Sequence, residues 1–154
     1  MKPLLLALGN DLMGDDAVGL VAARAMRQEM PEGWEVQEAA GNGLDLLDAL
    51  EGREKVLLVD AVCTGKVPPG TILEFGVPDF RHLAAASPHT VGLPEVMALA
   101  RELSLPFPSA MRILAMEVEP VMAVREGLSA VVAEALPRFL ERTRAICASM
   151  AAAP

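Results

Sequence analysis

Two short stretches of the chain are apolar at every position, and each has the length of a strand rather than of a helix. One, at residues 4–8, is bounded by Pro3 and Gly9, and the other occupies residues 56–59. A strand that is buried on both faces lacks the apolar–polar alternation of a half-exposed strand, and such strands are typical of parallel sheets covered by helices on both sides. The sequence therefore favours an α/β fold.

Helical and extended patterns alternate along the rest of the chain. Apolar residues recur at helical spacing from Asp16 onward, and Pro31 and Gly33 end that pattern. Strands that alternate with helices indicate parallel pairing. Strands are predicted over 4–8, 34–39, 55–62, 71–77 and 111–118, and helices over 16–30, 44–50, 90–103 and 129–148, with a helical turn at 80–84. The helix over 90–103 is expected to turn Val96, Met97, Leu99, Ala100 and Leu103 toward the core, and Ser129 is expected to cap the last helix.

The alternation of strands and helices breaks once, between residues 62 and 71. The connection there reads Cys-Thr-Gly-Lys-Val-Pro-Pro-Gly, which is too short for the crossover helix that joins two parallel strands. We therefore expect the strand over 71–77 to run antiparallel to the strand before it. A reversed strand of this kind commonly lies at the edge of an otherwise parallel sheet.

Size and charge exclude several classes of protein. A chain of 154 residues predicts a single domain, 1–154, with a core that needs no disulfide or metal to hold it. The net charge of -8 disfavours nucleic acid and anionic membranes as partners, because both require a positive surface. No apolar stretch approaches the roughly 20 residues of a membrane span. The short apolar N-terminus lacks a signal-peptide cleavage pattern, and a monomer is the expected state.

Cysteine usage indicates the cellular compartment. Cys63 and Cys147 are the two cysteines, and their spacing matches no zinc motif and no disulfide framework. Two free thiols are typical of a protein that works in a reducing cytoplasm. The sequence therefore predicts a cytoplasmic protein.

Polar residues that can carry chemistry follow the predicted strands at their carboxyl ends, where ligands bind in open α/β sheets. They are the residues of the segment 10–16, Asn42, Asp60, His89, Glu117 and Glu119. Among them, Asp16, Asp60 and His89 provide two carboxylates and one imidazole. This mixed oxygen and nitrogen set suits a borderline divalent ion such as zinc or nickel and leaves coordination positions open.

Each candidate also has an ordinary structural interpretation. Asp60 could brace a loop, His89 could cap or pack, and an acidic first turn at Asp16 could serve only the helix dipole. A phosphate-binding loop at 9–14 is disfavoured, because that segment is acidic and lacks both the G-x-G-x-x-G spacing and a Walker lysine. Ser87 with His89 and Asp60 would supply a nucleophilic set, but no glycine elbow accompanies it.

Four groups of motif residues occur in order over nearly the whole chain. They are Gly9-Asn10-x-Leu12-x-Gly14-Asp15-Asp16-x-x-Gly19, Val59-Asp60-Ala61 followed by Pro69-Gly70-Thr71, Ser87-Pro88-His89-x-x-Gly92-Leu93, and Glu119-Pro120 followed by Gly127-Leu128-Ser129. Each motif alone is short. Together, with this order and spacing, they resemble the motifs of the hydrogenase maturation proteases, which process the large subunit of [NiFe] hydrogenases.

The resemblance implies a three-layer α/β/α fold of the phosphorylase/hydrolase-like kind, with a five-stranded mixed sheet whose fourth strand is antiparallel. It implies an aspartic-type endopeptidase that recognises nickel already inserted in the large-subunit precursor and then removes a C-terminal extension. Asp16, Asp60 and His89 would be both the metal ligands and the catalytic residues. The nickel would be carried by the substrate and not be resident, although zinc or cadmium is expected to occupy the site in vitro.

One departure from the family pattern concerns substrate recognition. Many members have Gly-Gly-Thr after the second strand, at a loop linked to recognition of the target, whereas this chain has Gly41-Asn42-Gly43. The target hydrogenase is therefore left open. Two other functions also remain as alternatives at this point, a non-catalytic chaperone that checks the metal of the same precursor and a nucleotide-binding enzyme of similar architecture. Water activation by the metal or by a carboxylate of Asp16 or Asp60 is equally open.

Overall fold

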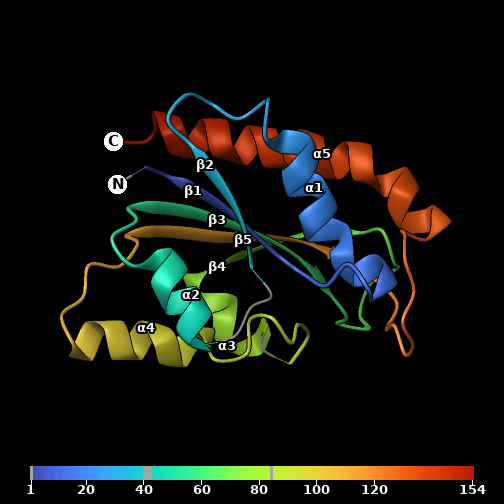
Figure 1. Ribbon diagram of the computed structural model, residues 1–154, viewed down its shortest axis with the longest axis horizontal. Helices are drawn as coiled ribbons and strands as arrows, with labels where there is room; N and C mark the ends of the chain where they lie inside the picture. Colours follow the sequence, from blue (N-terminus) through green and yellow to red (C-terminus); the bar gives the residue numbers. More distant parts are fainter. Residues whose placement is uncertain (1, 40–42, 84) are drawn as a thin grey trace.

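A five-stranded sheet lies at the centre of the computed structural model, which describes residues 2–39, 43–83 and 85–154 (Figure 1). The strand order is β2-β1-β3-β5-β4. All neighbours pair in parallel except β4, which lies at one edge and pairs antiparallel with β5. The strands are β1 (Leu4–Leu8), β2 (Glu35–Ala39), β3 (Lys55–Val62), β4 (Ile72–Gly76) and β5 (Ala110–Glu117). The predicted reversal of the fourth strand and its edge position are confirmed.

Helices cover both faces of the sheet and complete three layers (Figure 1). On one face lie α1 (Val18–Met26) and the long α5 (Ala130–Ala152), and on the other lie α2 (Gly43–Leu50), α3 (Phe80–Leu83) and α4 (Leu93–Glu102). Two short 3-10 helices, Gly14–Ala17 and Val77–Asp79, precede α1 and α3. This arrangement confirms the α/β/α architecture with a mixed sheet.

The continuous apolar run of β1 is explained by burial on both sides. Every residue of β1 is buried. Leu5 and Ala7 join the core beneath α1 and α5, whereas Leu4, Leu6 and Leu8 join the core on the α2 side. Burying one leucine side chain contributes about 2 kcal/mol. The sheet thus has an apolar core on each face, and neither face of its central strands is open to solvent. These two cores hold the strands in place, and with them the strand ends that carry the polar residues.

Two helix predictions need correction. The helix expected from Asp16 begins at Val18, after the 3-10 turn, and ends at Met26. The helix expected over 90–103 is α4, which begins only at Leu93 because Gly92 before it has the left-handed φ of +86°. Its buried positions are Leu93, Val96 and Ala100, whereas Leu99 and Leu103 are exposed.

The last helix is longer than the sequence predicts. Ser129 caps it as expected, because its Oγ accepts the Val132 N–H at 3.5 Å. The helix continues to Ala152, and Lys55 Nζ donates to the carbonyl oxygens of Met150 and Ala153 at that end. A cation at a helix C-terminus satisfies its last carbonyl groups. Within the described residues, no helix combines the length and the apolar character that a membrane crossing requires.

Candidate metal and catalytic site

Asp16, Asp60 and His89 meet at the carboxyl edge of the sheet. One ligand atom of each side chain lies within 4.8 Å of the others. Asp16 belongs to the 3-10 turn after β1, Asp60 lies two residues before the end of β3, and His89 lies in the loop that precedes α4. The structure therefore brings together the three residues that the sequence singled out, from three separate parts of the chain.

Two glycines allow the turn that carries Asp16 to approach the sheet. Gly9 has a φ of +154°, and a Cβ there would lie 2.5 Å from the carbonyl oxygen of Asp16. Gly19, near the start of α1, would place a Cβ 2.6 Å from the Val59 carbonyl oxygen and 2.8 Å from that of Leu8. Only glycine permits such close backbone contacts. Because Val59 directly precedes Asp60, this packing brings the two aspartates toward each other.

The adjacent aspartates of the turn point to different partners. Asp15 is buried, and its two carboxylate oxygens accept the Ser129 N–H at 2.6 Å and the Ser129 hydroxyl at 2.7 Å. Arg125 N–H also donates to the Leu12 carbonyl at 2.8 Å. These contacts tie the turn to the segment before α5. Asp15 is therefore a bracing residue, and Asp16 is left to face the site.

Hydrogen bonds orient each member of the trio. His89 Nε2 lies 2.8 Å from one carboxylate oxygen of Asp16 and 3.0 Å from the other. The two oxygens of Asp60 accept the Ala61 N–H, at 2.8 Å, and the Ser87 hydroxyl. The sequence analysis grouped Ser87 with Asp60 and His89, but it did not predict this direct hydrogen bond from Ser87 to Asp60. Because Ser87 directs its hydroxyl proton to Asp60, the arrangement disfavours a nucleophilic serine activated by His89, which would have to accept that proton.

Burial makes the Asp60 carboxyl an unusually weak acid. Its side chain has no exposed surface, and this desolvation raises the pKa of Asp60 to about 7 against the opposing effects of the Ser87 hydrogen bond and the His89 charge. A buried carboxyl with such a pKa ionises readily when a cation approaches it. The electrostatics of Asp60 therefore fit a metal ligand.

This raised pKa predicts an unusual stability profile for the metal-free protein. The folded-state pKa of about 7 exceeds the ordinary 3.8, so the folded state binds more protons between these values and stability falls as pH rises through that window. Asp60→Asn should remove this dependence and raise the free energy of unfolding at pH 8 by about 2–4 kcal/mol. Urea unfolding at pH 5 and pH 8 in the presence of a chelator measures the effect. An unchanged slope of stability with pH in the variant would contradict the assignment.

A cavity of about 320 Å³ opens onto Asp16 and His89 of the trio, with Asp60 buried behind them. Its lining includes Asn10, Asp16, His89, Glu119 and Cys63. Cys63 lies three residues after Asp60, and no role for it could be predicted from the sequence. Cys63 is exposed as a residue, but partial desolvation of its thiol and the neighbouring carboxylates, with Glu117 first, raise the pKa of that thiol. Cys63 is therefore a protonated neighbour of the site.

Glu117 and Asn10 brace the loops around this cavity. The buried carboxylate of Glu117 accepts the N–H of Thr64 at 2.7 Å and also its hydroxyl. Asn10 Oδ1 accepts the Leu12 N–H at 3.0 Å. Both residues stabilise the segments that follow β3 and β1. Glu117 and Asn10 therefore form hydrogen bonds to the backbone of these loops, whereas Glu119, another candidate at the strand ends, is exposed and lines the cavity.

The segment expected to recognise the substrate is described only at its last residue. Gly41 and Asn42 lie outside the described residues, and Gly43 is the first residue of α2. A Cβ on Gly92 would lie 3.8 Å from the Cα of Gly43. Because Gly92 is three residues beyond His89, the start of α2 lies beside the loop that carries the site histidine.

Comparisons with known proteins show the family of the chain. A family model described as hydrogenase maturation protease matches residues 18–146. The Hydrogenase 2 maturation protease of Escherichia coli is 26% identical over 151 residues, which are 94% of this chain and 92% of that protein. Protein FrxA of Pyrococcus furiosus is 30% identical over 133 residues, which are 84% of this chain and 93% of that protein.

Solved structures show the same fold. The hydrogenase maturating endopeptidase HybD from E. coli matches with a TM-score of 0.85 at 26% identity, over 97% of this chain and 94% of that one. The [NiFe] hydrogenase maturation protease HybD from Thermococcus kodakarensis matches with a TM-score of 0.74 at 28% identity, over 96% of this chain and 99% of that one. The resemblance seen in the sequence motifs is thereby confirmed, and the chain belongs to the hydrogenase maturation protease family.

Proposed function

We propose that this protein is an endopeptidase that removes the C-terminal extension from the precursor of a [NiFe] hydrogenase large subunit. We further propose that Asp16, Asp60 and His89 bind the nickel that the precursor carries, and that cleavage depends on this contact. The observation that carries the proposal is the convergence of one ligand atom from each of these three side chains within 4.8 Å. Membership of the protease family supports the reaction.

The donor set suits a metal that arrives with the substrate. Two carboxylates and one imidazole are ligands for nickel or zinc, and three protein donors leave positions for the substrate's own ligands. Burial raises the pKa of Asp60 to about 7, so a fraction of the molecules carry its proton near neutral pH, and an arriving cation would displace that proton. Zinc or cadmium should therefore also bind the isolated chain in vitro. Nickel in the precursor would act as a mark that metal insertion is complete.

The geometry favours Asp16 over Asp60 as a general base. Asp60 is fully buried, and both its oxygens already accept hydrogen bonds. Asp16 has a side chain that is 20% exposed, and it lines the cavity. A carboxylate that faces a cavity can reach a water molecule beside the scissile bond. A divalent ion can in turn polarise the scissile carbonyl or lower the pKa of that water.

The remaining parts of the proposal concern where and how the protease acts. We place the reaction in the cytoplasm, where the free thiols Cys63 and Cys147 would stay reduced. Residues 1–154 would act as one domain and as a monomer. We assign recognition of the target hydrogenase to the segment Gly41-Asn42-Gly43, and the position of Gly43 beside the His89 loop supports this assignment.

The decisive experiment compares nickel-loaded and nickel-free precursor. We expect the mass of the loaded precursor to fall by that of its C-terminal extension within minutes of incubation, and the nickel-free precursor to remain intact. The physical reason is that only the loaded precursor supplies the cation that Asp16, Asp60 and His89 require. Mass spectrometry of both samples gives the answer. Stable binding without any loss of mass would instead identify a chaperone.

A further inference from the structure

We infer that an apolar groove beside the site binds the C-terminal extension of the precursor, directly after the scissile bond. The groove is formed by residues 119–125 together with the start of α5, and we call it the 119–131 groove. This inference rests on the proposed function and adds the position of the segment that is cut off. It assigns binding of the extension to residues outside the trio.

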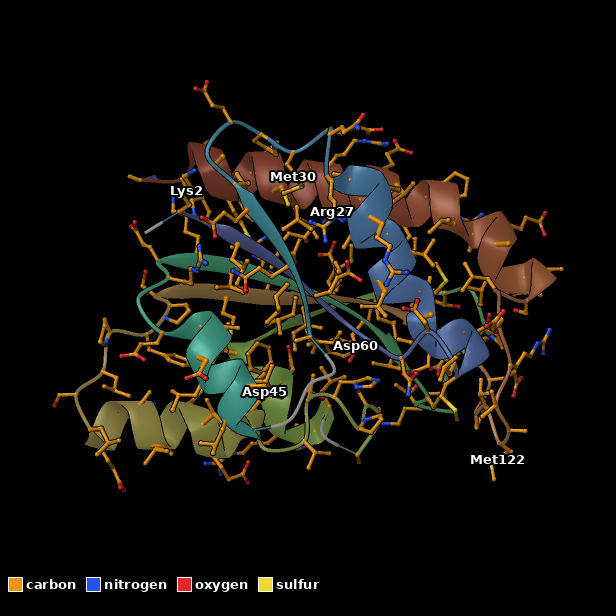
Figure 2. All side chains as sticks on the ribbon, in the orientation of Figure 1. Lys2, Arg27, Met30, Asp45, Asp60 and Met122 are labelled. Atoms are coloured by element: carbon orange, nitrogen blue, oxygen red, sulfur yellow. The ribbon has the colours of Figure 1, made fainter. Side chains whose placement is uncertain are left out.

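The 119–131 groove is large and exposes apolar side chains. Its volume is about 690 Å³, which is in the range of sites that bind small ligands or short peptide segments. Met122, Val124 and Val131 line it and are 91%, 74% and 51% exposed. Figure 2 shows Met122 at the outer edge of the molecule, whereas Asp60 lies inside it. Large apolar side chains gathered around one depression indicate a binding surface.

The groove is continuous with the cavity at the metal site. Glu119, Pro120 and Val121 line both the 119–131 groove and the cavity that contains Asp16 and His89. A peptide whose scissile bond lies at the trio can therefore pass directly from the cavity into the groove. This continuity identifies the occupant as the segment next to the scissile bond. A surface remote from the site would carry no such argument.

The segment that forms the groove is held in place before any ligand binds. At its start, Val118 N–H donates to the Val62 carbonyl at 2.9 Å, and at its centre Gly14 N–H donates to the Arg125 carbonyl at 2.7 Å. At its end, Ser129 is bound by Asp15. A preformed groove costs less ordering entropy on binding. Because the same contacts hold the turn that carries Asp16, the position of the groove relative to the site is fixed.

The charged residues of the cavity and of the groove suit different parts of the substrate. The cavity side carries the carboxylates of Asp16 and Glu119, which suit the part of the precursor that bears the cation. In the groove, the carboxylate of Asp15 is occupied by Ser129, and Arg125 adds a positive charge that offsets Glu119 at the end shared with the cavity. The remaining lining is mainly apolar. We therefore assign the groove to an extension whose first residues are apolar. The volume fits a few extended residues and not the folded body of the large subunit.

The test combines groove variants with a changed extension. Met122→Asp with Val124→Asp should raise KM for the nickel-loaded precursor about tenfold and leave kcat within about twofold, because charged groups would replace apolar contacts to the extension. Leu103→Asp is the control, because Leu103 directly follows α4 and is 59% exposed, and α4 lies in the helix layer on the other face of the sheet from α5. This variant should keep the wild-type KM. A wild-type KM in the groove variant would overturn the inference.

A precursor whose extension is replaced by Gly and Ser at equal length identifies the occupant. The KM of the wild-type protease should be about tenfold higher for this precursor than for the natural one. The KM of the groove variant should show no further increase, because the two changes remove the same contacts. Additive losses would show that the groove contacts the body of the large subunit and would overturn the inference.

A binding measurement separates this inference from the proposed function. Fluorescence anisotropy of a labelled synthetic extension peptide reports groove binding without any cleavage. Binding by the wild-type protein that is weakened about tenfold in the groove variant would support the groove even if no precursor were cut. Absence of peptide binding, or equal binding by the groove variant, would count against the groove even if wild-type cleavage were normal.

Discussion

Asp16→Asn, Asp60→Asn and His89→Ala should each lower kcat/KM for cleavage of the nickel-loaded precursor by about 10³-fold or more. His89→Ala removes one of the three donors whose ligand atoms lie within 4.8 Å of one another, and each Asp→Asn change replaces a charged carboxylate donor with a neutral amide. Fewer or weaker donors bind the cation less tightly and misplace the scissile bond that is held next to it. The measurement is the rate at which the mature large subunit appears, followed by mass spectrometry.

Two controls make this result specific to the site. His82→Ala removes the other histidine, which is exposed on α3, and should leave cleavage at the wild-type rate. Asp60→Asn is expected to be more stable than the wild-type protein without metal, because it no longer buries an ionisable group with a pKa of about 7. Its loss of activity would therefore not arise from unfolding. Wild-type cleavage by any of the three site variants would show that its residue has no part in the reaction.

The central strands of the sheet were predictable from local sequence, because a strand that is buried on both faces is apolar at consecutive positions. β1 and β3 are apolar on both faces, since one set of side chains meets α1 and α5 while the other meets the α2 side. The length of the link after Val62 gave the reversal of β4, because no helix fits there. The face of α4 was less predictable, because its apolar residues extend beyond the buried stripe, and Leu99 and Leu103 lie outside that stripe.

The convergence of the trio was predictable from topology, but its orientation was not. Parallel strands end at one edge, so Asp16, Asp60 and His89 were expected to lie close together. Which aspartate of the pair at 15 and 16 faces the site depends on a partner, Ser129, that is 114 residues away from Asp15. The bond from Ser87 to Asp60 likewise joins residues that are 27 positions apart. Contacts of this kind depend on the path of the backbone and leave no local pattern.

Gly19→Ala should lower the free energy of unfolding by about 3–5 kcal/mol. A Cβ at residue 19 would lie 2.6 Å from the carbonyl oxygen of Val59 and 2.8 Å from that of Leu8. These atoms belong to the backbone of β3 and β1, at the centre of the sheet, so neither can move aside as a flexible side chain would. Helix α1 must therefore shift outward and lose contacts with the core. The gain of about 1 kcal/mol in helix propensity is too small to offset this.

Gly43→Ala is the matched control, because Gly43 also lies in a helix, and its nearest contact would be an ordinary 3.8 Å to a methyl group of Val96. This variant should be as stable as the wild type or more stable by up to about 1 kcal/mol. Urea unfolding of the two variants measures the difference, and equal stability would contradict the close packing of α1. The same shift of α1 moves Asp16 away from Asp60, so cleavage by Gly19→Ala should fall even where the variant remains folded. The glycine of the N-terminal motif would then set the spacing of the site, because it brings the turn of Asp16 against the strand of Asp60.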